Sequence, residues 1–330
     1  MGPDWHFLPP KYNGLKIDAH THLHLGPNGD FTGFDKVLNV ADANHITQIA
    51  AIIDEDLMKE LNANYPDRFI PIRFLRSKTL LEGGAKAATE MIEEIYSQEY
   101  RMVKFWFAPR WKDYVEQEFH ISTKDIKVNG LSSPLFAPIF ETIETLGLKF
   151  LIHISDPDLW YEKKYQPASK YGTKSEHLKD FEQVMDQYPK IQFQVAHFGA
   201  QPENLPKLAR WLDTYPNLMI DTGSARWMGR VLSRNPEKSR DFIEKYSDRI
   251  LFGTDLSFGW TRDNSPEKYF LTRYFTFHTL FETDLRNVPL PFPDPENGNK
   301  TVINGLNLSK STLEKIYWKN AQSFYQDLLH

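Results

Sequence analysis

The 330-residue chain contains no cysteine. Disulfides, thiolate nucleophiles and cysteine-ligated zinc or iron–sulfur sites are therefore excluded, and any bound metal must be held by histidines and carboxylates. No apolar run approaches the roughly 18 residues of a membrane-spanning helix, and "MGPDWHFLPPKYNG" at the N-terminus has no leader-like pattern. We expect no membrane association. A cytoplasmic location is favoured, although an exported protein whose leader has been removed would look the same.

An excess of one charge is also lacking. The chain has 39 basic and 44 acidic residues, a net charge of −5, and the two signs are mixed along its length. Without a basic block or an arginine-rich stripe, nucleic acid is not an expected partner. Hydrophobic residues make up 41% of the chain, which is enough for one large core. The expected partner is a small-molecule substrate, and a homodimer is compatible with this composition.

Short runs rich in β-branched and aromatic residues recur along the chain and predict eight strands. These runs are 15–23, 46–54, 68–75, 101–108, 148–155, 191–199, 217–224 and 249–255. Amphipathic stretches between them predict helices at 85–98, 135–146, 178–188, 203–214 and 237–246. Eight strand–helix units without a break favour a (β/α)₈ TIM barrel over an open doubly wound sheet. We expect residues 14–330 to form this single domain after an N-terminal tail of residues 1–13.

Three connections are much longer than the others, and all of them leave the C-terminal ends of predicted strands. They are 109–133, 156–177 and 256–311. Barrel enzymes build their active sites at this face. Because these loops are rich in Trp, Tyr, Pro and Asn, we expect them to cover the barrel mouth as a lid. Trp106, Trp160 and Trp260 should then lie near the pocket.

The segment "KIDAHTHLHLG" places Asp18, His20, His22 and His24 at every second position. Alternate side chains of a strand share a face, so these four residues would point into the barrel. The residues expected to pack outward are Leu15, Ile17, Ala19 and Leu23. Two imidazoles at this spacing can converge on one metal ion, whereas a buried ring without a partner is costly. A polar strand end solvated in the mouth is the alternative.

More candidate ligands follow at the ends of later strands. His153 ends "FLIHISDP", His197 ends "QVAHFG" and Asp255 ends "LFGTD". Each residue alone also fits a satisfied core position, but their shared place at strand ends favours a metal site. Histidines with a carboxylate suit Zn²⁺, with Mn²⁺ and Fe²⁺ as alternatives. For Asp221 on strand seven, a supporting hydrogen-bond acceptor or a helix N-cap is favoured over ligation.

This combination resembles the amidohydrolase superfamily, and more closely the amidohydrolase-related branch that includes aminocarboxymuconate-semialdehyde decarboxylase. The matching pieces are "IDAHTHL", "LIHISDP", "VAHFG", "ILFGTD" and the ending "IYWKNAQSFY". The likeness covers nearly the whole chain. It implies a TIM barrel with one divalent metal, and it implies that His197 lies near the metal-bound water and not on the metal. The implied metal ligands are His20, His22, His153 and Asp255.

The expected chemistry begins with a metal that lowers the pKa of bound water toward neutrality. Asp255 would ligate the metal and act as general base and then general acid, while His197 would steady the water or polarise a substrate carbonyl. These roles favour hydrolysis of an amide, ester or lactone in a small carboxylate-bearing substrate. Decarboxylation of an unsaturated or aromatic carboxylic acid, a lyase reaction, is the alternative. A non-catalytic metal-binding barrel is a further one.

Five more residues are candidates for substrate contacts. The alternation in "RMVKFWF" points Lys104 and Trp106 inward. Lys104 is expected to anchor a substrate carboxylate or a buried ion pair; a carboxylated lysine that bridges two metals is the alternative. His24 matches no ligand of the resembled family, and we expect it at the mouth, against substrate. Arg226 would bind an anionic group, and Trp160 would contribute to the lid.

Overall fold

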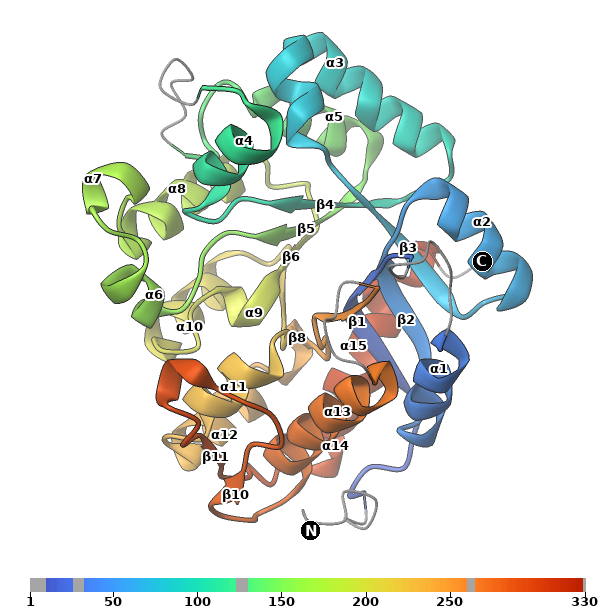
Figure 1. The fold of residues 1–330 in the computed structure, drawn as a ribbon, viewed down its shortest axis with the longest axis vertical. Helices are drawn as coiled ribbons and strands as arrows, with labels where there is room; N and C mark the ends of the chain where they lie inside the picture. Colours follow the sequence, from blue (N-terminus) through green and yellow to red (C-terminus); the bar gives the residue numbers. More distant parts are fainter. Residues whose placement is uncertain (1–9, 26–32, 123–129, 260–264, 329–330) are drawn as a thin grey trace.

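The computed structural model describes residues 10–25, 33–122, 130–259 and 265–328. Within these residues, parallel strands form one sheet in the order β8-β7-β6-β5-β4-β3-β2-β1-β9, with helices around it (Figure 1). The strands are β1 (Lys16–Leu23), β2 (Ile46–Ile52), β3 (Phe69–Phe74), β4 (Met102–Trp106), β5 (Lys149–His153), β6 (Phe193–Val195), β7 (Leu218–Asp221), β8 (Ile250–Leu251) and β9 (Leu256–Phe258). The small strands β10 (Val288–Pro289) and β11 (Val302–Ile303) pair separately and antiparallel.

The predicted eighth strand, 249–255, is a strand only at β8, and β9 follows it within the segment that was expected to be a connection. The barrel closes between these two short strands, because β8 pairs with β7 and β9 pairs with β1. Two backbone hydrogen bonds join β1 to the residues between them: Ala19 N donates to Phe252 O at 2.7 Å, and Asp255 N donates to His20 O at 2.7 Å. The predicted (β/α)₈ barrel is therefore confirmed, and Asp255 lies at the break, with a φ of +56°.

The predicted helices are present, each within a few residues of its expected bounds except at the start of α3. The helices of the described residues are α1 (Phe34–Ala43), α2 (Glu55–Asn64), α3 (Ser77–Ser97), α4 (Trp111–Phe119), α5 (Ala137–Leu146), α6 (Asp158–Lys163), α7 (Ala168–Tyr171), α8 (Lys174–Gln187), α9 (Ala196–Gly199), α10 (Leu205–Thr214), α11 (Ala225–Leu232), α12 (Pro236–Lys245), α13 (Pro266–Glu282), α14 (Lys310–Glu314) and α15 (Asn320–Phe324). No helix in this part of the chain is long and apolar enough to cross a bilayer.

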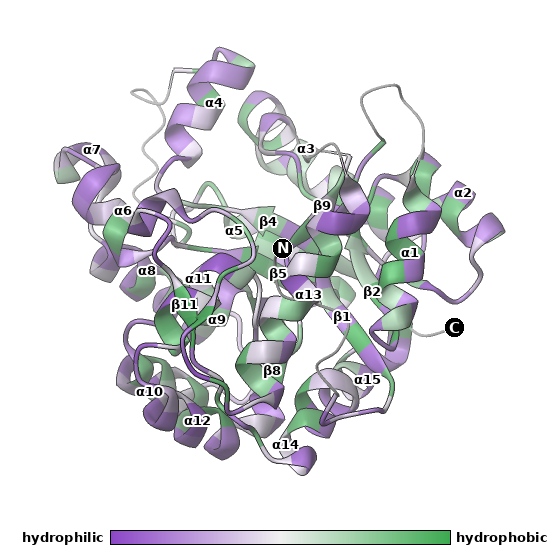
Figure 2. Cartoon of the chain, turned by 60° about the horizontal axis from the view of Figure 1, so that its bottom comes forward, coloured by the Kyte–Doolittle hydropathy of each residue, from purple (hydrophilic) through white to green (hydrophobic). Residues whose placement is uncertain are grey.

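Two apolar layers hold the barrel together. Val103 and Phe105 of β4 pack with the surrounding helices in an outer layer, whereas Met102 belongs to an inner cluster. The C-terminal residues Phe324 and Tyr325 also belong to the inner cluster. Figure 2 shows hydrophobic residues along the central strands and hydrophilic ones on the outer sides of helices such as α10 and α12. Burial of the strands on both faces explains their nearly continuous apolar runs.

Residues 11 and 12 of the predicted N-terminal tail are attached to the barrel. The backbone N–H groups of Lys11 and Tyr12 donate to Oε2 of Glu282 on α13, at 2.9 and 3.1 Å. Lys16 at the start of β1 binds the other oxygen, Oε1, of the same carboxylate at 3.0 Å. This buried glutamate thus fixes the entry of the chain into the first strand. The division into a tail and one domain remains a prediction.

The alternation predicted along the first strand is wrong for Ile17 and Ala19. Both pack in the inner cluster with Met102 and Leu251, and not outward against helices. The pairing of β1 with β2 shifts register between Asp18 and Thr21. Such a bulge inserts a residue and re-aims the side chains that follow it. The shift is what allows apolar residues before the bulge and histidines after it to occupy the same interior.

Candidate metal centre

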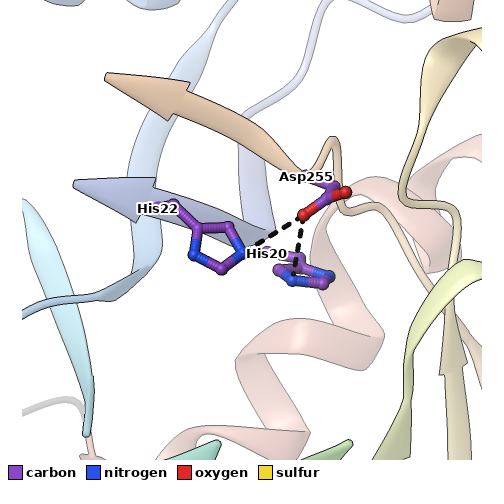
Figure 3. A group of neighbouring side chains, drawn as sticks. All are labelled: His20, His22 and Asp255. Carbon is purple, nitrogen blue, oxygen red and sulfur yellow. Dashed lines mark ion pairs between the residues drawn. The ribbon is translucent and has the colours of Figure 1, made fainter. Parts of the chain in front are cut away.

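Two imidazoles from β1 and a carboxylate from the break before β9 converge at the mouth of the barrel (Figure 3). Nε2 of His20 and Nε2 of His22 each lie 3.3 Å from Oδ1 of Asp255. One ligand atom from each residue lies within 4.8 Å of the other two. Ligand atoms about 2.1 Å from a tetrahedral metal are about 3.4 Å apart, so this group has the spacing of a divalent metal site.

The protonation states suit metal binding as well. Burial alone would raise the pKa of Asp255, but the imidazoles of His20 and His197 hold it well below its usual range. Burial lowers the pKa of His22, so its ring is neutral at neutral pH. A carboxylate and neutral imidazoles are the forms that bind a metal cation.

Asp221 of β7 orients His20 from behind. Its Oδ2 lies 3.0 Å from Nδ1 of His20, which fits a ring that carries its proton on Nδ1 and turns Nε2 toward Asp255. Nε2 of His20 is buried and makes no hydrogen bond with any residue that the structure describes. A cation at this atom would satisfy it. Asp221 therefore has the supporting position that was favoured for it over ligation.

His197 begins a left-handed turn that follows β6. The φ angles of His197, Phe198, Gly199 and Ala200 are +58°, +57°, +60° and +57°. For residues with a Cβ this conformation costs about 1–2 kcal/mol each. Asp221 Oδ1 accepts a hydrogen bond from His197 N at 3.0 Å and so ties the turn to β7. Strained backbone of this kind is typical of functional sites.

The imidazole of His197 lies beside the metal group. Its Nε2 is 3.8 Å from Oδ2 of Asp255. Burial lowers the pKa of His197 to about 4, although the carboxylate of Asp255 opposes this shift. The ring is therefore neutral at neutral pH, and it lies within reach of a molecule bound at the metal group.

His153, the fourth predicted ligand, lies apart from the other three. Its Nδ1 is 2.9 Å from Nε2 of His197, and its Nε2 is 3.2 Å from Oδ1 of Asp156. Both ring nitrogens therefore have partners in this structure. Asp156 was not anticipated, although its position three residues after His153 in "HISDP" was a signal that could have indicated it. The structure thus brings together His20, His22 and Asp255, and the ligation of His153 remains a prediction.

A cavity of about 160 Å³ opens beside Asp255, His153 and His197. Trp160, Trp227 and Arg226 contribute to its walls, together with Arg230 and Glu296. Trp160 and Arg226 were predicted contacts. The others were missed, because nothing in the local pattern marks them.

The two arginines of the cavity differ in their partners. Arg230 donates to Asp294 at 2.8 and 3.0 Å and to Glu296 at 2.8 Å, so its charge is neutralised. Nε of Arg226 is buried without a hydrogen bond, and no carboxylate in the described part of the chain pairs with its guanidinium. Arg226 is therefore the cation that remains available to an anionic ligand.

The other predicted contact residues flank the metal group and not the described cavity. Lys104 is buried inside the barrel, where burial lowers its pKa to about 8 against the opposing carboxylate charge of Asp255. The Trp106 ring lies 6.2 Å from the His153 ring, and the His24 ring lies 6.1 Å from the His22 ring. Their roles toward a substrate remain predictions.

The long connections meet at the same end of the barrel. Nε1 of Trp160, after β5, donates to the carboxylate of Glu296, after β9, at the edge of the cavity. The hydroxyl of Tyr171 donates to Asp113 of α4 at 2.9 Å, which joins the connections after β5 and β4. This is the arrangement expected of a lid. Trp260, also predicted near the pocket, lies outside the described residues.

A family model described as amidohydrolase matches residues 17–326 of the chain. No curated protein matches the chain at a significant level. The match of the family model includes the whole metal group and, apart from the first residue of β1, the strands of the described residues.

Several solved structures share the fold. The 2,6-dihydroxybenzoate decarboxylase from Rhizobium is 15% identical over 95% of this chain and 99% of its own, with a TM-score of 0.55. The 5-carboxyvanillate decarboxylase from Novosphingobium aromaticivorans, solved with manganese, is 13% identical over 95% and 96%, with a TM-score of 0.54. A probable 2-pyrone-4,6-dicarboxylic acid hydrolase from Acinetobacter baumannii is 12% identical over 94% and 99%, with a TM-score of 0.52. At these identities the likeness shows a shared fold.

Proposed function

The chain belongs to the amidohydrolase family and is an enzyme of that superfamily, and we propose on this premise that it is a metal-dependent hydrolase. Its substrate is a small, carboxylate-bearing compound with an amide, ester or lactone bond. The observation that carries this proposal is the group of His20, His22 and Asp255 beside a cavity that holds Arg226, whose guanidinium pairs with no carboxylate of the described residues.

One divalent metal is proposed at this group. His20, His22 and Asp255 would hold it, with His153 as the fourth ligand after release from His197. Zn²⁺ fits this donor set, and Mn²⁺, which the 5-carboxyvanillate decarboxylase contains, fits it as well. When bound, the metal supplies Lewis acidity and lowers the pKa of a water molecule that it contacts.

The residues of the chain divide the remaining work. The Asp255 carboxylate accepts the proton of the attacking water and returns it to the leaving group. The neutral His197 ring holds or donates a proton close to the bond that is broken. Arg226 binds the carboxylate of the substrate, and the indoles of Trp160 and Trp227 provide apolar walls on which a ring can pack.

Decarboxylation of an aromatic carboxylic acid is the second candidate. It is supported by the decarboxylases among the similar structures, which act on dihydroxybenzoate and carboxyvanillate. In that reaction Asp255 would first take a proton from water and then deliver it to carbon as CO₂ leaves. We place hydrolysis first because a cation such as Arg226 stabilises a bound carboxylate in the ground state, which slows its loss as neutral CO₂.

Metal analysis and isotope labelling test the proposal together. The protein should retain one equivalent of a divalent metal after purification without chelators. With aryl esters, lactones and hydroxybenzoates offered in ¹⁸O water, a hydrolase places ¹⁸O in the organic product. Release of CO₂ without ¹⁸O incorporation would establish the decarboxylase instead. Two metal equivalents with a carboxylated Lys104 would contradict the mononuclear site, and substoichiometric metal would contradict a metal centre altogether.

A further inference from the structure

A buried chain of hydrogen bonds runs from the C-terminal end of the protein to the metal group. The hydroxyl of Tyr325, the residue that follows α15, donates to Oε1 of Gln194 on β6 at 2.6 Å. Nε2 of Gln194 donates to Oδ2 of Asp221 at 2.9 Å. The same carboxylate oxygen lies 3.0 Å from Nδ1 of His20. All four residues have 0% of their surface exposed, so water does not compete for these bonds.

The same two residues hold the bulge in β1. Nε2 of Gln194 donates to the carbonyl oxygen of Ala19 at 2.9 Å, and the hydroxyl of Tyr325 lies 3.1 Å from that oxygen. Ala19 lies within the register shift, immediately before His20. The side chains of Gln194 and Tyr325 thus stabilise the backbone distortion that turns the histidines into the interior.

The numbers of donors and acceptors show which group donates in each hydrogen bond between Tyr325 and His20. The amide nitrogen of Gln194 has two protons, and its two acceptors are Ala19 O and Asp221 Oδ2. An inverted amide would place its oxygen against both of these oxygens, and the Tyr325 hydroxyl prevents this by donating to Oε1. Since Asp221 only accepts, His20 donates to it from Nδ1 as long as Gln194 keeps the carboxylate in this position. In the neutral form of the ring, Nε2 of His20 then carries no proton.

We propose that Tyr325 and Gln194 are positioning residues of the metal centre, which fix the tautomer and the aim of His20 through Asp221 and the Ala19 carbonyl. The inference rests on the proposed function in one respect, that the centre binds a metal. It adds a role for the segment around Tyr325, after α15. This segment packs in the inner cluster and also influences the metal affinity of the site. Substitution of a partner one step behind a ligand, which is the position of Asp221, typically changes metal affinity tenfold to a hundredfold, and Gln194 and Tyr325 act through this carboxylate.

The first test is metal affinity. Tyr325→Phe removes one hydroxyl and keeps the ring, and Gln194→Met removes the amide at similar volume. The matched control is Tyr317→Phe, because Tyr317 is equally buried and its hydroxyl donates at 3.0 Å to Glu282, outside this chain of bonds. Zn²⁺ and Mn²⁺ titrations of the metal-free proteins, in competition with a chromophoric chelator, should show about a ten- to hundredfold loss for both test variants. Tyr317→Phe should bind like wild type.

The second test needs no metal. Nitrogen NMR of histidine-labelled, metal-free protein reports which nitrogen of His20 carries the proton, and the Nδ1–H form should fall in both test variants while it persists in Tyr317→Phe. If the variants keep both the affinity and the tautomer of the control, the inference is overturned. Failure of wild type to bind metal would instead overturn the proposed function, and the tautomer would still decide the inference. If Tyr325→Phe does not fold, Gln194→Met decides it.

Discussion

Nδ1 of His153 and Nε2 of His197 lie 2.9 Å apart, so one ring donates a hydrogen bond to the other. His153 also has Asp156 at its second nitrogen, 3.2 Å away. Neither nitrogen of His153 can bind a metal while both contacts persist. A metal that binds Nδ1 of His153 must therefore separate the two rings, which frees Nε2 of His197, an atom 3.8 Å from Oδ2 of Asp255.

Replacing each of these histidines should distinguish a metal ligand, His153, from a catalytic group, His197. We expect His153→Asn to lower Zn²⁺ affinity by more than about tenfold, since it removes a ligand. His197→Asn should keep the metal and lose turnover by about 10²-fold or more, because its ring acts on water or substrate. Metal content by mass spectrometry and initial rates check both. Equal metal loss in the two variants would show that His197 is also a ligand.

Asp255 should be needed for more than metal binding. Asp255→Asn keeps an oxygen for the metal but removes the proton acceptor, so the variant should retain a substantial fraction of metal and lose turnover by about 10²–10⁴-fold. Asp248→Asn is the control, because that carboxylate is exposed and pairs with Lys315 on the surface. A fully metallated Asp255→Asn enzyme with wild-type turnover would refute the acid–base role under either chemistry.

Arg226 should discriminate between charged and neutral ligands. Benzoate and benzamide have nearly the same shape, and wild type should bind benzoate more tightly because the guanidinium of Arg226 lines the cavity. Arg226→Met should lose about ten- to a hundredfold of benzoate affinity and most of this preference. Calorimetric titration measures both ligands. Arg234→Met, exposed beyond the end of α11, is the control. If Arg226→Met kept the preference for benzoate over benzamide, another group would bind the carboxylate.

Glu282 should make the free energy of unfolding depend on pH in the acidic range. Burial alone would raise the pKa of Glu282, but its bond to His278 and the charge of Lys16 lower it to about 2. A group whose folded pKa is depressed stabilises the fold above its unfolded pKa of about 4.5, and this contribution is lost as the pH falls from there toward 2. Glu282→Gln should therefore cost about 3 kcal/mol or more at pH 7.

Urea unfolding at a series of pH values measures this dependence. The difference between wild type and Glu282→Gln should shrink steadily below about pH 4.5. Glu90→Gln on α3 is the matched control, because Glu90 is exposed and its ion pair, at 3.5 Å, is with an exposed Lys86. It should change stability by no more than about 0.5 kcal/mol. A pH-independent difference for Glu282→Gln would mean that its carboxylate titrates normally in the folded protein.

Local chemistry was enough to predict much of this protein. Strand positions follow from runs of β-branched and aromatic residues, because a strand buried on both faces must be apolar throughout. The candidate ligands could be identified because His20, His22 and Asp255 are polar interruptions at the ends of such runs, where a barrel opens to its substrate. Both signals depend on neighbours within a few positions, so the sequence by itself determined the barrel and the members of the metal group.

The tertiary structure alone decided the orientation of the side chains on β1 and the ion pairs of the arginines in the cavity. Ile17 and Ala19 face the interior because a bulge, held by Gln194 and Tyr325 from 175 and 306 positions away, breaks the alternation of β1. Within the described residues Arg226 pairs with no carboxylate, while Arg230 on the same helix is neutralised by two carboxylates more than 60 positions distant. The physical reason is common to both cases: hydrogen bonds and ion pairs are satisfied by whichever groups the fold brings close, and that proximity is not written in the local pattern.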